Sequence, residues 1–168
     1  MTTPASAPAR TSGGGAGSWA LIGLSSALGA LAFVLPLLGE GARFGGRAAP
    51  LLLAATVGLG LAVAVPEAGG RLGARAVALL AAIVAAASAL RFVEVLLPGP
   101  GGFTPIFAPL VLVGWAWGPR LGFLAGTLTM AVSAVATGGV GPWLPYQAIA
   151  AGWVGLSAGL LPGARGPI

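Results

Sequence analysis

Two charged residues, Arg91 and Glu94, interrupt a long apolar segment of the chain. Their three-residue spacing puts both side chains on the same side of a helix. A charge at the bilayer midplane costs at least about 2.5 to 3.5 kcal/mol, so such residues are usually functional. Counted from Arg75, Arg91 lies about 24 Å along a helix, near one end of a bilayer core about 30 Å thick. We therefore expect polar groups at the mouth of a pocket. The alternative is an arginine that extends to the interface with Glu94 as its partner.

A second group of polar and aromatic residues precedes the last apolar segment. Trp143 and Tyr146 offer flat apolar surfaces with one N–H or O–H each, and the Gln147 amide needs partners once it leaves water. Small-molecule sites combine an apolar wall with a few polar groups in this way. Taken alone, the two aromatic residues could equally be interfacial anchors. The substrate-binding pocket is expected to face outward and to consist of Arg91, Glu94, Phe103, Trp143, Tyr146 and Gln147.

The residue inventory argues against catalysis and metal binding. The charged residues are eight Arg and three Glu, and the sequence has no Lys, Asp, His, Asn or Cys. A nucleophilic serine would have no His or Lys as its base. Zinc and redox-metal sites need thiolate, imidazole or clustered carboxylates, and a P-loop needs a lysine. We therefore expect a chain that is not an enzyme and binds no cofactor itself.

Composition indicates a membrane protein. Of 168 residues, 57% are hydrophobic and 7% charged, whereas about a quarter of the residues of soluble proteins are charged. A helix of about 20 apolar residues crosses a bilayer, and in lipid such runs must be helical. The expected fold is an all-α, polytopic membrane bundle of about six transmembrane helices. The six apolar runs are 19–38, 48–65, 76–97, 103–118, 121–136 and 142–161.

The loops between these runs set the expected topology. With six spans, one side holds Arg10, Arg71, Arg75, Arg120 and Arg165, and the other holds Arg43 and Arg47. The positive-inside rule then places both termini in the cytoplasm. The net charge of +5 reflects this topology, since scattered arginines form no nucleic-acid-binding stripe. The expected parts are a flexible tail (1–18), two leading helices (19–66), a four-helix region (67–162) and a short tail (163–168).

Small residues recur at four-residue spacing in the last four runs. In lipid, close approach through small side chains supplies much of the packing between helices, so these runs are expected to form one bundle. Run 76–97 carries two adjacent alanine stripes and is expected to contact two neighbours, one of which could belong to another chain. The alanine stripes are Ala78, Ala82, Ala86 and Ala81, Ala85, Ala89; the other small-residue sets are Gly114, Gly118; Gly122, Gly126; and Ala151, Gly155, Gly159.

The most distinctive stretch is GGVGPWLPYQ at 138–147, followed by AGWVG at 151–155 and AGLLP at 158–162. With these segments, residues 75–162 resemble the substrate-specific (S) components of energy-coupling factor (ECF) vitamin transporters. The resemblance implies a multi-pass plasma-membrane subunit that binds a vitamin or similar micronutrient from outside. It also implies two kinds of partner, a transmembrane coupling protein (the T component) and two cytoplasmic ATPases that hydrolyse ATP. The family's alanine motif, here matched by the two alanine stripes, meets the T component.

The family core has six helices, and from Arg75 onward this chain has four apolar runs. The expectation is an S component without the last two core helices, from a truncated or split gene or with the leading helices in their place. Two other functions stay open: a structural or assembly subunit that binds no solute, and a self-assembling channel or small exporter. The cargo also stays open, because Arg and Glu suit a zwitterion or carboxylate, while the aromatic residues suit a flat ring or a corrin.

Overall fold

The computed structural model describes residues 13–34, 51, 54–55, 58, 74–97, 104–141 and 143–163, and its regular elements there are all helices. The predicted all-α fold is therefore confirmed for the described residues. Run 48–65 lies largely outside them. The helices are α1 (Gly13–Val34), α3 (Ala74–Leu96), α4 (Phe107–Trp117), α5 (Pro119–Thr137) and α6 (Leu144–Gly159).

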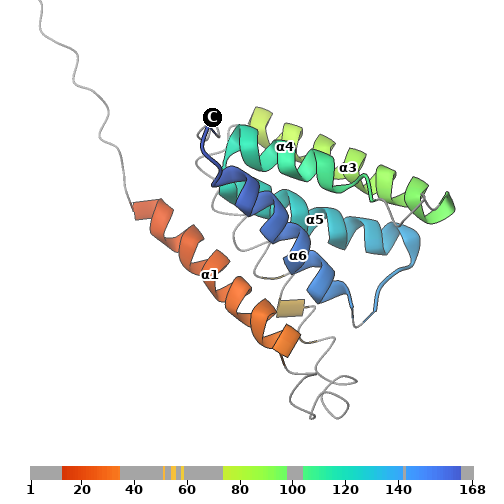
Figure 1. Ribbon diagram of the computed structural model, residues 1–168, viewed down its shortest axis with the longest axis horizontal. Helices are drawn as coiled ribbons and strands as arrows, with labels where there is room; N and C mark the ends of the chain where they lie inside the picture. Colours follow the sequence, from red (N-terminus) through yellow and green to blue (C-terminus); the bar gives the residue numbers. More distant parts are fainter. Residues whose placement is uncertain are drawn as a thin grey trace, which may run out of the picture.

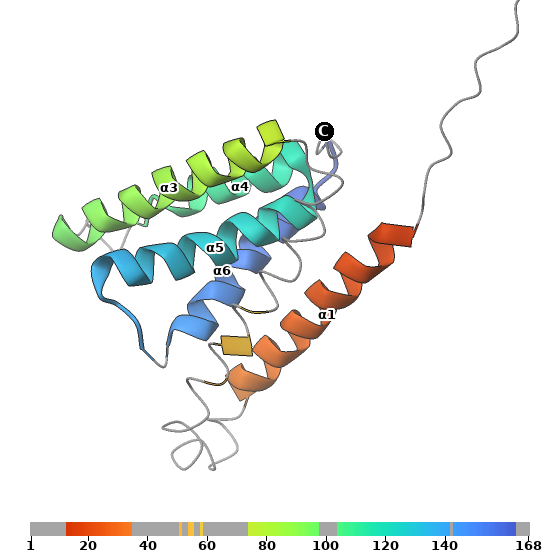
Figure 2. The ribbon, with the colours of Figure 1, turned by 180° about the vertical axis from the view of Figure 1, so that it is seen from behind.

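Helices α3 to α6 alternate in direction, which brings four helix ends together (Figures 1 and 2). The end of α3, the start of α4, the end of α5 and the start of α6 lie at one end of this bundle. The start of α3, the junction between α4 and α5, and the end of α6 lie at the other. The short connections between successive helices dictate this antiparallel order. As a result, Arg91 and the turn before α6 lie at the same end, as the sequence predicts.

A single residue, Gly118, joins α4 to α5. Its φ of 95° and ψ of 169° belong to a backbone region that is open almost only to glycine. Pro119 then starts α5, at the helix position where a missing N–H costs nothing. Run 103–118 is helical only from Phe107, because Pro105 precedes the helix and Gly118 ends it. The resulting 11 residues of α4 rise about 16 Å, less than a bilayer core about 30 Å thick.

Glycine and alanine bring α4, α5 and α6 into backbone contact. A Cβ added to Gly155 of α6 would lie 2.9 Å from the Cα of Gly122 on α5. A Cβ on Gly114 of α4 would lie 2.9 Å from the carbonyl carbon of Gly155. Gly126 of α5 faces the Ala151 backbone in the same way. The small-residue sets of these three helices are therefore the interhelical contacts that their spacing predicts.

Helix α1 packs along α6, on the side of the bundle away from α3 (Figures 1 and 2). The indole N–H of Trp153 donates to Ser26 Oγ at 2.9 Å, and Gly29 leaves room for Ile149. Helix α1 begins at Gly13, six residues before the predicted run at 19–38. Ser18 is buried at 3% exposure, whereas Gly17 and Trp19 beside it are exposed. The expected flexible tail at 1–18 therefore overlaps the first residues of α1.

Helix α3 packs on α5 through one narrow face. Val84 and Ala87 are buried there, and the Ser88 hydroxyl donates to the Thr129 carbonyl of α5 at 3.4 Å. The two alanine stripes are not this contact, because all six of their residues are exposed. The prediction that these stripes meet a neighbour thus finds no partner among the described residues. The contact with α5 is instead made on another side of α3, where Val84, Ala87 and Ser88 lie.

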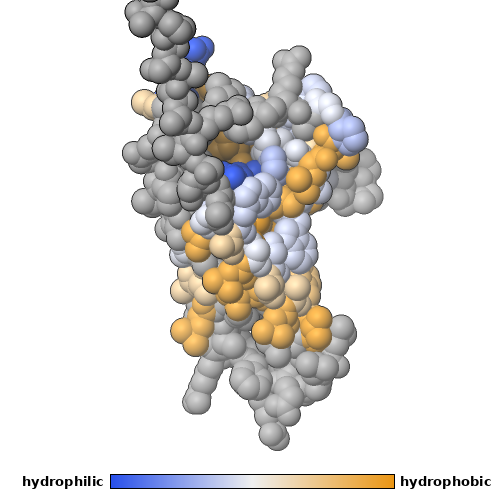
Figure 3. Space-filling view, turned by 90° about the vertical axis from the view of Figure 1, so that its left-hand side faces the viewer, coloured by the Kyte–Doolittle hydropathy of each residue, from blue (hydrophilic) through white to orange (hydrophobic). Residues whose placement is uncertain are grey.

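Two of the described helices are long and apolar enough to cross a membrane, Val77–Leu96 and Pro119–Thr137. Gly17–Leu31 and Phe107–Trp117 are shorter apolar helices. Much of the described surface in Figure 3 carries apolar side chains, as expected of a protein with lipid around it. Six spans and cytoplasmic termini stay predictions.

Candidate substrate-binding site

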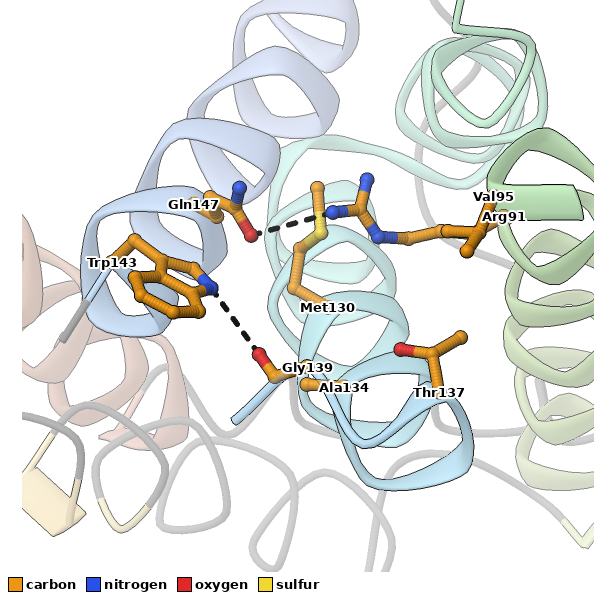
Figure 4. A pocket seen from close by; sticks show the side chains of 8 residues that line it. All are labelled: Arg91, Val95, Met130, Ala134, Thr137, Gly139, Trp143 and Gln147. Carbon is orange, nitrogen blue, oxygen red and sulfur yellow. Dashed lines mark hydrogen bonds between the residues drawn. The ribbon is translucent and has the colours of Figure 1, made fainter. Parts of the chain in front are cut away.

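A cavity of about 170 Å³ lies between α3, α5 and the turn before α6. Helices α3 and α5 and the segment from the turn into α6 all contribute to its lining, and Arg91 and Gln147 face each other across it (Figure 4). The cavity is at the end of the bundle where α3 and α5 finish and α6 starts. Its lining consists of Arg91, Val95, Met130, Ala134, Thr137, Gly139, Trp143 and Gln147.

Arg91 reaches across the cavity to α6. One of its terminal N–H groups donates to Gln147 Oε1 at 3.4 Å, the long limit of a hydrogen bond (Figure 4). The two residues are 56 positions apart in the chain. They meet because the antiparallel order brings the last turns of α3 to the same end of the bundle as the first turn of α6. The guanidinium thus points across the cavity from α3 toward α6 (Figure 4).

Trp143 closes one side of the cavity. Its indole N–H donates to the Gly139 carbonyl at 3.2 Å, which ties the ring to the turn that follows α5 (Figure 4). Gly138 ends α5 with a φ of 67°, a left-handed conformation that glycine adopts without strain. Gly141 leaves the space that the indole occupies, because a Cβ there would lie 2.5 Å from two of its ring carbons. The glycines of this turn therefore position the indole.

Glu94 lies near the cavity but does not line it. Its Oε1 accepts a hydrogen bond from the Thr104 hydroxyl at 2.9 Å, and its Oε2 is buried with no partner among the described residues. Within the described part of the chain, Arg91 and Glu94 form no ion pair. Although their spacing puts both on one side of α3, Arg91 turns toward α6, and Glu94 turns toward the residues before α4.

Tyr146 also points elsewhere. Its ring lies edge-on to Phe33 of α1, with centroids 5.2 Å apart, and Phe33 also stacks on Trp153 at 6.2 Å. Tyr146 and Gln147 are consecutive on a helix, so their side chains leave α6 about 100° apart. Phe103 lies outside the described residues. Of the six predicted pocket residues, the structure therefore brings together Arg91, Trp143 and Gln147.

Helix α5 supplies lining residues that the sequence reading omitted. Met130, Ala134 and Thr137 follow one another at spacings of four and three residues and so share a face. The Thr137 hydroxyl donates back to the Ser133 carbonyl at 2.8 Å, which leaves its oxygen as an acceptor toward the cavity. The helix order could have predicted these residues, because in an antiparallel bundle the last turns of run 121–136 must lie at the same end as Arg91.

This arrangement suits binding rather than chemistry on a substrate. Its polar groups are a guanidinium, an amide and a hydroxyl, and its apolar groups are Met130, Val95 and the Trp143 indole. None of them is a nucleophile with a neighbouring base. A donor-rich wall facing apolar surface is typical of a site that holds and orients a small molecule.

The described helices form an α-helical bundle with a polar cavity at one end. A sequence profile described as ECF-type riboflavin transporter, S component, matches residues 74–165, more than half of the 168-residue chain. The chain therefore belongs to the family of ECF S components, which are membrane-embedded transporter subunits. The predicted family is thus confirmed. No curated protein and no solved structure matches the chain.

Proposed function

We propose that the chain is the substrate-binding subunit of an ECF-type importer in the plasma membrane. It captures a vitamin or similar micronutrient from outside, and a T component with two ATPases drives delivery. The observation that carries this proposal is the meeting of Arg91, Trp143 and Gln147 around one cavity within the family-matched region. Riboflavin is the first compound to test, because the description of the matching family names it.

The positions of the arginines support the proposed orientation. Arg75 at the start of α3 and Arg120 at the start of α5 lie at the end of the bundle opposite the cavity (Figure 1). The positive-inside rule makes that end cytoplasmic, so the cavity would face outward. The positions of Arg75 and Arg120 are therefore consistent with a cavity that takes up its ligand from outside the cell.

The exposed alanine stripes of α3 are the proposed contact with the T component. All six side chains are uncovered by the described chain, and small exposed residues let a partner helix approach the backbone closely. The chain itself would bind no ATP, which the partner ATPases would hydrolyse.

The test is direct binding to the purified full chain without ATP. Riboflavin and other water-soluble vitamins are titrated in turn, and saturable binding of one of them is expected. Trp143→Ala and Gln147→Ala should each weaken this binding by at least about tenfold, since each removes a wall or a hydrogen-bonding group of the cavity. Trp115→Ala is the matched control, because Trp115 lies on α4 and not in the cavity lining.

Unchanged affinity in both cavity variants would overturn the assignment of the site.

A second candidate function is an assembly subunit that binds no solute. The cavity volume of about 170 Å³ favours it, since sites for whole drug-sized ligands usually measure about 300 to 1,000 Å³. Co-purification with a T component, together with no saturable binding of any vitamin, would support it.

A further inference from the structure

Within the part of the chain that the structure describes, the positive charge of Arg91 faces the cavity without a negative partner. Among the described residues, its one interaction is the 3.4 Å hydrogen bond to the neutral Gln147 amide. The guanidinium carries five N–H donors in a fixed fork, so most of its donors are left for another group. Arg91 is half-buried, and a charge held partly out of water is stabilised by an anion or by further hydrogen bonds.

Glu94, three positions after Arg91, does not pair with it among the described residues. Its Oε1 accepts from Thr104, and its Oε2 has no hydrogen-bond partner in the described part of the chain. The whole sequence has only three acidic residues, so few groups of this chain could neutralise Arg91. None of the residues that line the cavity is acidic.

The hydrogen-bonding groups of the lining are mostly donors. The Gln147 amide oxygen already accepts from Arg91, which leaves its NH₂ group as a donor. The Gly139 carbonyl already accepts from Trp143. Among the other described side chains of the lining, the Thr137 oxygen offers an acceptor. Two sets of donors, one of them charged, therefore face any molecule that enters the cavity.

We infer that the cavity selects a small molecule through an anionic group, a carboxylate or a phosphate, which Arg91 and the Gln147 NH₂ group bind together. This inference rests on the proposed function. An arginine fork binds such groups through two parallel hydrogen bonds, and Met130, Val95 and Trp143 provide apolar surface beside them. A volume of about 170 Å³ accommodates this group and the atoms next to it rather than a whole vitamin. A cation would meet the guanidinium charge and is rejected.

The experiment uses pairs of compounds that differ in one anionic group. The pairs are riboflavin 5′-phosphate and riboflavin, biotin and biotinamide, and nicotinate and nicotinamide. Each is titrated calorimetrically into the purified full chain in dodecyl maltoside, a detergent without phosphate. In the pair whose scaffold binds, the anionic member should bind at least about tenfold more tightly, as expected for charge-assisted hydrogen bonds.

Variants of α3 assign this preference to Arg91. Arg91→Gln should reduce it to less than about threefold, Arg91→Lys should retain part of it, and the control Trp115→Ala on α4 should leave it unchanged. Thermal unfolding of each variant separates a lost interaction from a lost fold. Equal or tighter binding of the neutral member, or a preference that survives in Arg91→Gln, would overturn the inference. Saturable binding of a neutral or cationic vitamin alone would overturn it and leave the proposed function standing.

Two further outcomes have distinct meanings. Binding of no vitamin at all would contradict the proposed function, and the inference with it. Phosphatidylglycerol, titrated into the same detergent solution, distinguishes a lipid headgroup from a soluble ligand. Displacement of the bound compound by this lipid, lost in Arg91→Gln, would assign the cavity to a lipid phosphate and overturn the choice of a soluble anion.

Discussion

Helices α3 and α5 are the two long apolar helices of the bundle, yet they are built for different surroundings. Over its most apolar window, 61% of α5 is buried, against 22% for α3. Helix α5 contacts α3, α4 and α6, and its contacts with α4 and α6 are glycine and alanine against backbone. Helix α3 contacts α5 along one face, has a smaller contact with α4, and leaves most of its remaining surface exposed.

The charges follow the same division. Helix α3 carries Arg91 and Glu94, whereas α5 has no charged residue after Arg120 at its start and α6 has none at all. Backbones that touch leave no space for a cavity or a long polar side chain. A peripheral helix with a looser contact can supply both. The binding site thus lies where α3 meets the tightly packed pair, and the outer face of α3 is available to lipid or to a partner chain.

The largest expected effect is on the contact between α5 and α6. Gly155→Val would place a Cβ 2.9 Å from the Gly122 Cα and even closer to its carbonyl group, so the helices would have to separate. We expect a loss of stability at the upper end of the range for overpacked sites, about 3 kcal/mol. Thermal unfolding of the purified protein measures it.

The matched control is Gly23→Val on α1, where an added Cβ meets nothing within 4 Å. It should change stability by no more than about 0.5 kcal/mol. If both variants unfold at the same temperature, the packing that distinguishes α5 from α3 does not hold the bundle together.

A smaller effect is expected at the contact between α3 and α5. Ser88→Ala removes a hydroxyl that donates to the Thr129 carbonyl at 3.4 Å. This long hydrogen bond should contribute about 0.5 kcal/mol, close to the average for polar contacts between membrane helices. The control is Ser133→Ala, because the Ser133 hydroxyl donates its hydrogen bond to the Met130 carbonyl within its own helix. A loss above about 1.5 kcal/mol in Ser88→Ala alone would show that α3 depends on a polar anchor.

The sequence predicted the helices of the bundle well. Uncharged apolar runs of this length have few alternatives, and Gly118, Pro119 and Gly138 mark the ends of α4 and α5. The four-residue spacing of Gly114, Gly122 and Gly155 with their small neighbours also predicted real contacts, because a glycine stripe favours close approach whatever the partner.

The sequence predicted the site only in part. It placed Arg91, Trp143 and Gln147 at one end, since topology fixes which helix ends meet. It did not determine where Tyr146 and Glu94 turn, because those directions depend on contacts outside their own helices, with Phe33 and Thr104. The start of α1 at Gly13 was also missed, because a glycine-rich segment carries little helix signal.

The smallest expected effect on stability belongs to the outer face of α3, where the proposed partner docks. Ala82→Leu adds bulk to an exposed position in the middle of an alanine stripe, so it should change thermal stability by less than about 0.5 kcal/mol and leave ligand affinity intact. If a T component packs there, the same bulk should weaken that interface by about 1 to 3 kcal/mol through overpacking and should lower ATP-dependent uptake by about tenfold or more.

Uptake is measured in proteoliposomes that contain the T component and both ATPases. Ala136→Leu adds the same bulk to an exposed alanine of α5 at the cavity end and should leave uptake unchanged. Equal uptake by Ala82→Leu and the unaltered protein would mean that lipid, not a partner chain, covers the alanines of α3.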